Sequence, residues 1–187
     1  MSLCNDNFFI LTGAMGAGKS TVIKFFEDSD IICIPEPARK ILYEQRLIVG
    51  KGVPEDSPDI FTQLVLSRAT NYYMLCSEEY RKRICLFDRG IPDMIAYAEL
   101  FGLDTEVYYN AAKMYEYNLS VFLFEGWGEI YVTDDERRMT YAQAERFGER
   151  IAEIYKELGY DVITVPKTVP EERWLFIQNR ISRLISD

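Results

Sequence analysis

One segment constrains the fold of this chain more than any other, the run Gly13-Ala-Met-Gly-Ala-Gly-Lys19-Ser20. It matches the pattern GxxxxGK followed by Ser or Thr, and it directly follows the apolar residues 8–12, which predicts a strand, a turn and a helix in succession. Glycines let the turn aim backbone N–H groups at an anion, and the helix N-terminus adds partial positive charge. The segment therefore predicts a phosphate-binding loop, in which Lys19 reaches the β- and γ-phosphates of a nucleotide and Ser20 ligates Mg²⁺.

Short apolar runs alternate with stretches of helical pattern along the chain. The runs are residues 8–12, 31–34, 84–87, 121–124 and 160–165, and all but the last are continuously apolar. A continuous run is typical of a strand that is covered on both faces in a parallel sheet. Helical patterns occupy residues 19–28, about 60–81, about 92–117, 141–158 and about 170–185. The alternation predicts an α/β fold, with a parallel five-stranded sheet flanked by helices, and the glycines and prolines of 50–58 predict a loop.

Composition excludes several classes of protein. Histidine is absent, which rules out Ser-His-Asp triads and histidine-ligated metals. The net charge of −9 argues against a nucleic acid partner. No apolar run approaches the roughly 20 residues of a membrane span, and residues 1–7 lack a signal-peptide pattern. Of the four cysteines, Cys33 and Cys85 lie in apolar runs, which favours reduced, buried thiols and a cytoplasmic location.

Two carboxylates follow apolar runs at the edge where an open α/β sheet binds its ligands. Asp88 follows the third run, as a Mg²⁺-water ligand or general base, or alternatively as a solvated strand end or helix cap. Glu36 follows the second run, as a base for a phosphoryl-acceptor alcohol, or alternatively as a loop carboxylate paired with Arg39. Asp93 opens the next helical pattern, and both a substrate contact and a first-turn acid favoured by the helix dipole stay open.

An arginine-rich segment follows the fourth apolar run. Arg137 and Arg138 are adjacent, and Arg146 lies further along. Arginines that close over a transferring phosphoryl group stabilise its charge and exclude water. The alternative is a solvated helix with ion pairs to Glu136 and Glu145.

These motifs, in this order, carry a resemblance to a known family. They are the loop 13–20, Glu36-Pro-Ala-Arg39, Phe87-Asp-Arg-Gly90 with Asp93, the stretch 131–137, and Leu158-Gly-Tyr160 with Val165-Pro166. The set resembles the NadR-like P-loop ATPase/kinase domains, which include a nicotinamide riboside kinase domain, and more distantly the deoxynucleoside kinases. The resemblance covers nearly the whole chain.

The resemblance implies a three-layer P-loop NTPase fold, with residues 1–187 as a single kinase-like domain and a small lid at about 126–146. It implies ATP and Mg²⁺ as cofactors, with Ser20 and Asp88 at the metal. Nucleotide binding falls to Gly13, Ala14, Met15, Gly16, Ala17, Gly18, Lys19, Ser20, Thr21, Arg137, Arg138, Pro166 and Lys167. The catalytic set is Lys19, Glu36, Asp88, Arg89 and Arg137, and the substrate set is Glu36, Arg39 and Asp93. Many such lids carry several spaced arginines, so which arginine reaches phosphate stays open here.

The leading hypothesis is an ATP-dependent kinase that phosphorylates a hydroxyl of a small molecule, with nucleoside-like acceptors among the candidates. The alternative is a nucleotide-binding regulatory ATPase with slow hydrolysis and a macromolecular partner. The pair Glu36 and Asp88 favours the kinase, because a pure switch needs no base for an acceptor alcohol. A GTPase is disfavoured, since no NKxD-like motif is present. The sequence carries no signal for the oligomeric state.

Overall fold

The computed structural model describes residues 2–27, 29–132 and 139–186, and a parallel sheet lies at its centre. The strands of this sheet stand in the order β3-β4-β2-β6-β7, and they are β3 (Ile32–Ile34), β4 (Cys85–Asp88), β2 (Phe8–Gly13), β6 (Ser120–Phe124) and β7 (Asp161–Thr164). All neighbouring strands in it are parallel. Each strand falls on one of the five predicted apolar runs, so the predicted sheet is confirmed.

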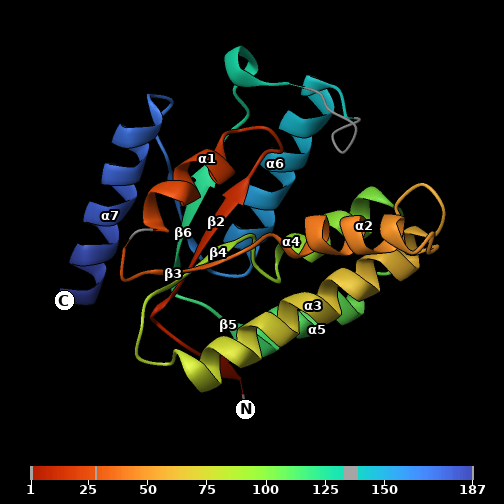
Figure 1. The fold of residues 1–187 in the computed structure, drawn as a ribbon, viewed down its shortest axis with the longest axis horizontal. Coiled ribbons are helices and arrows are strands. Elements are labelled where there is room, and N and C mark those ends of the chain that lie inside the picture. The colour runs from red at the N-terminus through yellow and green to blue at the C-terminus, as the bar shows by residue number, and fades with distance from the viewer. Residues whose placement is uncertain (1, 28, 133–138, 187) are drawn as a thin grey trace.

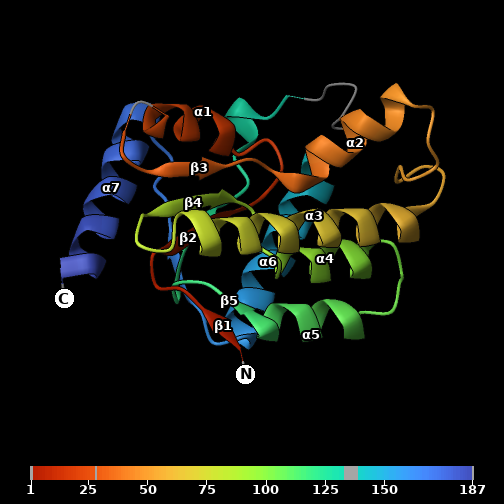
Figure 2. The same cartoon turned by 60° about the horizontal axis from the view of Figure 1, so that its bottom comes forward.

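The helices cover both faces of this sheet (Figures 1 and 2). One face carries α1 (Lys19–Ile23), the 3₁₀ turn η1 (Lys24–Phe26) and α7 (Pro170–Ser186). The other face carries α3 (Pro58–Glu79), α4 (Asp93–Leu100) and α6 (Tyr141–Glu157). Alternate residues of β2 serve the two sides, since Phe9 and Leu11 pack toward α1 and α7 whereas Phe8 and Ile10 pack toward α3, α4 and α6. This two-sided burial is the reason that β2 is continuously apolar.

The sheet register brings three chain segments to one edge. Leu11 of β2 pairs with Asp88 of β4, and Gly13 of β2 pairs with Phe124 of β6. The carboxyl ends of the three strands therefore meet where α1, α4 and the 3₁₀ turn η2 (Gly128–Ile130) begin. A ligand site in an open α/β sheet is expected at such an edge.

The helical pattern predicted for about 92–117 is wrong as a single helix. It divides into α4 and α5 (Glu106–Met114), because the chain turns at Gly102 with a φ of +66°. Two-residue β5 (Tyr115–Glu116) then pairs with β1 (Leu3–Cys4) in a small separate sheet. The predicted loop at 50–58 is confirmed as the connection between α2 (Pro37–Leu47) and α3, although α2 itself was not predicted.

Two further observations bear on the composition arguments. Within the part of the chain that the structure describes, no helix combines the length and apolarity needed to cross a membrane. All four cysteines lie in that part and are free thiols, with Cys85 buried and Cys33 half-buried.

Substitution of Gly13 measures how closely the ends of β2 and β6 pack. A Cβ added there would lie 2.1 Å from the Phe124 carbonyl oxygen, at a backbone φ of +120°. We expect Gly13→Ala to lower the free energy of unfolding by about 3 kcal/mol or more, because the backbone of β6 must move. Gly102→Ala is the matched control, since Gly102 also has positive φ but nothing lies within 4 Å, so about 1 kcal/mol is expected. Urea unfolding of both variants measures the difference, and equal losses would contradict it.

Candidate active site

The predicted phosphate-binding loop connects β2 directly to α1. Its backbone has positive φ at Gly13, Gly16 and Gly18, a conformation that other residues rarely adopt. The Ala14 amide donates to the Phe124 carbonyl at 2.9 Å, which ties the loop to β6. On the opposite side, a Cβ added at Gly148 of α6 would lie 2.8 Å from the Ala14 nitrogen, so α6 and the loop are in backbone contact. The loop is thus held on two sides.

Lys19 lies buried within this loop. Its ammonium Nζ donates to the Ala14 carbonyl oxygen at 2.8 Å and to that of Gly13 at 3.5 Å. Burial, followed by the nearby Arg89 cation, lowers the pKa of Lys19 to about 7. An anion bound in the loop would reverse this shift, because it would stabilise the charged ammonium.

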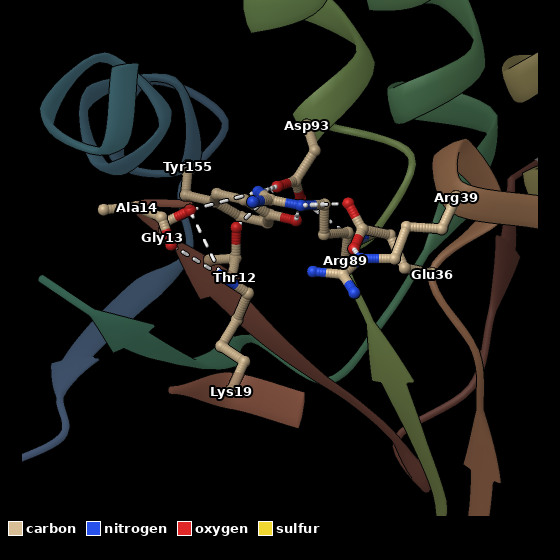
Figure 3. Close-up of polar contacts among 10 residues, drawn as sticks. Thr12, Gly13, Ala14, Lys19, Glu36, Arg39, Arg89, Asp93 and Tyr155 are labelled. Atoms are coloured by element: carbon tan, nitrogen blue, oxygen red, sulfur yellow. Dashed lines mark hydrogen bonds and ion pairs between the residues drawn. The ribbon is translucent and has the colours of Figure 1, made fainter. Parts of the chain in front are cut away.

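Arg89 is the centre of a buried ion-pair network at the end of β4 (Figure 3). Its Nε donates to Glu36 Oε1 at 3.1 Å, and its Nη1 donates to Asp93 Oδ1 at 2.8 Å and to the Gly13 carbonyl oxygen at 3.1 Å. One guanidinium therefore joins three different segments: the loop after β2, the residue before α2 and the first turn of α4. The Arg89 backbone has a φ of +73°, a left-handed conformation that costs a non-glycine residue roughly 1–2 kcal/mol.

Asp93 is fully buried, and its carboxylate is saturated by the chain itself. Oδ1 accepts from Thr12 Oγ1 at 2.6 Å in addition to Arg89, and Oδ2 accepts from Tyr155 Oη at 2.6 Å and the Gly90 amide at 3.0 Å. Because its exposed fraction is 0%, Asp93 cannot touch a ligand in this arrangement. In this arrangement Asp93 is a first-turn acid of α4 that holds Arg89 in place, and its substrate contact stays a prediction.

Glu36 immediately precedes α2 and belongs to the same network. Oε2 accepts from Arg39 Nε at 2.9 Å, and Oε1 accepts from Arg89, so the predicted alternative of an Arg39 pair is present together with a second pair. Burial opposes the charged form, yet the cations of Arg89, Arg39 and Lys19 hold the pKa of Glu36 below its ordinary value. Its side chain remains 12% exposed, which leaves it accessible to a ligand as an anionic hydrogen-bond acceptor.

Asp88 lies beside Arg89 but in a different environment. Its Oδ1 is buried and has no hydrogen-bond partner. Burial and the nearby Glu36 carboxylate raise the pKa of Asp88 to about 6. An orphaned carboxylate oxygen on a residue that lines one cavity with Ser20 suits a hard cation, which prefers oxygen ligands. Among the described residues no group of three or more acidic or cysteine side chains could cage a metal, so a cation here would also need phosphate or water ligands.

A cavity of about 830 Å³ opens over the phosphate-binding loop. Near the loop its walls come from the 127–130 turn and from residues 167–173, and they include Trp127, Ile130, Lys167, Thr168 and Arg173. Beyond Glu36 its walls come from α2, α3 and α4, and they include Ala38, Leu42, Phe61, Tyr97 and Phe101. A second cavity of about 510 Å³ lies on the other side of Glu36 and is lined by Ser20, Asp88 and neighbouring residues of α1, β3 and α2. Ser20, Glu36 and Arg39 line both cavities.

The predicted site residues are distributed unevenly over these cavities. Those that line the larger one are Met15, Gly16, Ala17, Gly18, Lys19, Ser20, Thr21, Glu36, Arg39, Arg89 and Lys167. Gly13, Ala14 and Pro166 are absent from its lining, and Asp88 lines the smaller cavity. Arg137 and Arg138 lie outside the described residues, so their predicted lid role stays a prediction.

Arg173 is a cavity residue next to the phosphate-binding loop that sequence reasoning missed. It lies in the first turn of α7, and its stripe of buried residues continues with Ile177 and Ile181. The spacing i, i+4, i+8 of Arg173, Ile177 and Ile181 could have predicted a buried arginine from the sequence. An arginine is rarely placed in a core, so this position could have been singled out as functional. Two polar side chains of the neighbouring helix α3 lie outside the cavity: Gln63 is exposed, and Arg68 forms a bidentate pair with Glu44.

Comparisons with known proteins agree with this geometry. A family model described as an AAA domain, AAA_28, matches residues 8–173. Deoxyadenosine kinase from M. mycoides, solved with the products dCMP and dCDP, has a TM-score of 0.68 at 15% identity, covering 94% of this chain and 99% of that one. NadR in complex with NR has a TM-score of 0.65 at 16% identity, covering 96% of this chain and 50% of that one. No curated protein matches in sequence. The likenesses confirm the predicted P-loop kinase fold and the predicted resemblance.

Burial of the ionised Asp88 carboxylate should lower the free energy of unfolding at neutral pH. Its pKa is raised to about 6 from an ordinary 3.8, so the folded chain binds this proton more tightly than the unfolded chain. Stability contributed by Asp88 therefore falls as pH rises from about 4 to about 6, and the loss is complete at pH 7. We expect Asp88→Asn to raise the free energy of unfolding of the ligand-free protein at pH 7 by roughly 1–3 kcal/mol, and to have little effect near pH 4.

Urea unfolding at both pH values measures this change. The matched control is Asp56→Asn, which removes an exposed aspartate from the 50–58 loop and should leave stability within about 0.5 kcal/mol. A loss of stability in Asp88→Asn at pH 7 would contradict the buried, uncompensated carboxylate.

Proposed function

We propose that this chain, which belongs to the AAA_28 family of AAA domains, is an ATP-dependent kinase that transfers the γ-phosphoryl group to a hydroxyl of a small molecule. One observation carries the proposal: a single cavity is lined at one end by the phosphate-binding loop and at the other by an apolar compartment beyond Glu36. A protein that only hydrolyses a nucleotide needs no second compartment, whereas a kinase must hold an acceptor there.

The nucleotide would occupy the end of the cavity next to the loop. Backbone N–H groups of 13–20 would surround the β-phosphate, and Lys19 would leave the Ala14 carbonyl to contact the β- and γ-phosphates. Ser20 and the unpartnered Asp88 carboxylate would hold Mg²⁺, which supplies charge neutralisation on the phosphates when bound. Lys167 would border the base. A lid at about 126–146, with Arg137 or Arg138 at the transferring phosphoryl group, completes the proposed single domain.

The acceptor would occupy the compartment beyond Glu36. Its walls are mainly apolar and aromatic, with Leu42, Phe61 and Phe101 among them, and this suits a flat ring. Arg39 and Glu36 supply polar contacts at the side that faces the phosphate loop. The names of the structural neighbours support a nucleoside-like acceptor, since one is a deoxyadenosine kinase and the other was solved with NR.

In the proposed reaction the acceptor oxygen attacks the γ-phosphorus while the bond from that phosphorus to the leaving oxygen of ADP breaks. Glu36 would accept the hydrogen bond of the attacking hydroxyl and take its proton. The lowered pKa of Glu36 makes it a weak base, but a loose phosphoryl-transfer transition state needs positioning more than deprotonation. Arg89 would hold Glu36 at the correct distance, because its own geometry is fixed by Asp93. We place the reaction in the cytoplasm, where thiols stay reduced.

The experiment that tests the kinase is Mg-ATP consumption by the purified protein, with and without pooled nucleosides, vitamins and sugars. We expect one pool to accelerate ADP release, and subdivision of that pool to yield a phosphorylated acceptor. Slow ADP release that no pool accelerates would contradict the kinase and favour the regulatory ATPase.

Two substitutions separate the roles within the site. Lys19→Ala should abolish both ATP binding and turnover. Glu36→Gln should lower acceptor phosphorylation by about 10²- to 10⁴-fold while ATP affinity changes only a few-fold, because Glu36 acts on the acceptor. Glu44→Gln, the same change in α2 at a glutamate that pairs with Arg68 outside the cavity, is the control and should leave turnover unchanged. Full acceptor phosphorylation by Glu36→Gln would overturn the role given to Glu36.

A further inference from the structure

Arg173 stands against the phosphate-binding loop from a helix far along the chain. Its Nη2 donates to the Ala17 carbonyl oxygen at 2.9 Å. A Cβ added at Gly18 would lie 2.7 Å from its Nη1, so the guanidinium touches the loop backbone itself. The residue also lines the larger cavity. The first turn of α7 therefore places a cation directly beside the last residues of the loop.

Within the part of the chain that the structure describes, this cation is buried without a compensating charge. Arg173 is 3% exposed, and no carboxylate of the described residues forms an ion pair with it. Its Nε is buried without a hydrogen-bond partner, and burial lowers the pKa of the guanidinium. A buried, unpaired charge is strongly unfavourable, so its retention in a folded chain calls for an anion that arrives from outside. The other buried arginine of the site, Arg89, is by contrast paired with two carboxylates.

The packing around the guanidinium indicates which part of a ligand it would meet. Its Cζ lies 4.5 Å from the centroid of the Phe124 ring and 5.6 Å from that of Trp127. Both rings contact the cation by cation–π interaction, and the donors of a guanidinium lie in its own plane. In-plane donors bind oxygen acceptors, and a phosphate is the acceptor that such a planar group matches best.

From these contacts we infer that Arg173 is a nucleotide-binding residue, whose guanidinium binds the phosphate chain held by the loop 13–20. The inference rests on the proposed function only for the identity of the ligand as a nucleotide. It adds a cation from α7 to the loop backbone and Lys19, so two separate segments, the loop and α7, would neutralise the phosphates. It also makes α7 part of the binding site rather than only a cover for the sheet.

Calorimetric titration of the full chain, with Mg²⁺ present, tests this assignment with three probes: ADP, pyrophosphate and adenosine. We expect Arg173→Leu to weaken ADP and pyrophosphate binding by about 10- to 100-fold, the range expected for loss of a charged hydrogen bond, and to leave adenosine binding unchanged. Arg173→Gln keeps a donor for the Ala17 carbonyl and should show the same loss, which covers the case in which Arg173→Leu does not fold. Arg180→Leu, an exposed arginine two turns along α7, is the matched control and should bind like the wild type.

A purely structural role for Arg173 makes different predictions. It would lower the thermal stability of the ligand-free variants while leaving their pyrophosphate affinity within about twofold of the wild type, and that result overturns the inference. Equal losses of affinity for adenosine and for pyrophosphate would also overturn the inference, since they would indicate that Arg173 contacts the base as well. If the wild-type protein binds neither pyrophosphate nor ADP, both the inference about Arg173 and the proposed kinase function are overturned. Phosphate-specific loss in a protein that phosphorylates no acceptor refutes the kinase alone.

Discussion

The guanidinium of Arg89 is the contact on which the arrangement of the site depends. A buried arginine must be paired, and here Asp93 and Glu36 share that task while the Gly13 carbonyl accepts a further hydrogen bond. Asp93 is in turn fixed by Thr12 and Tyr155, which extend the network to β2 and α6. Because one guanidinium contacts all three segments, the loop, the start of α2 and the start of α4 are positioned together rather than separately.

Glu36 and Asp88 follow neighbouring strands, yet their surroundings shift their pKa values in opposite directions. Three cations surround Glu36 and keep it ionised, whereas Asp88 sits where burial outweighs its cationic neighbours. Glu36 is thus an ionised hydrogen-bond acceptor, whereas the Asp88 carboxylate would be stabilised by an added cation. The two residues differ in this way although both are acidic side chains at one sheet edge. The chain sacrifices some stability at Asp88, as functional sites commonly do.

Sequence reasoning succeeded where a physical signal is local. The strands were readable because two-sided burial makes each run apolar, and the loop was readable because positive φ demands glycine at fixed positions. It failed where the partner is distant along the chain. The position of Asp93 left a ligand contact and a first-turn acid both open, because two of its partners, Thr12 and Tyr155, lie 81 and 62 residues away. The division of 92–117 at Gly102 was missed, because one glycine within a helical pattern is often tolerated.

Arg89 adopts a left-handed backbone immediately after Asp88, and the two side chains line different cavities. One peptide unit thus separates the smaller cavity, which Asp88 lines, from the larger cavity, which Arg89 lines, and Glu36 lines both. The register of this dipeptide is consequently as important as its composition. A one-residue insertion or deletion next to Asp88 and Arg89 would change which cavity each side chain lines. The acid-arginine pair would still be present in a sequence alignment. Homologues with such a shift would look conserved and yet have lost the partition.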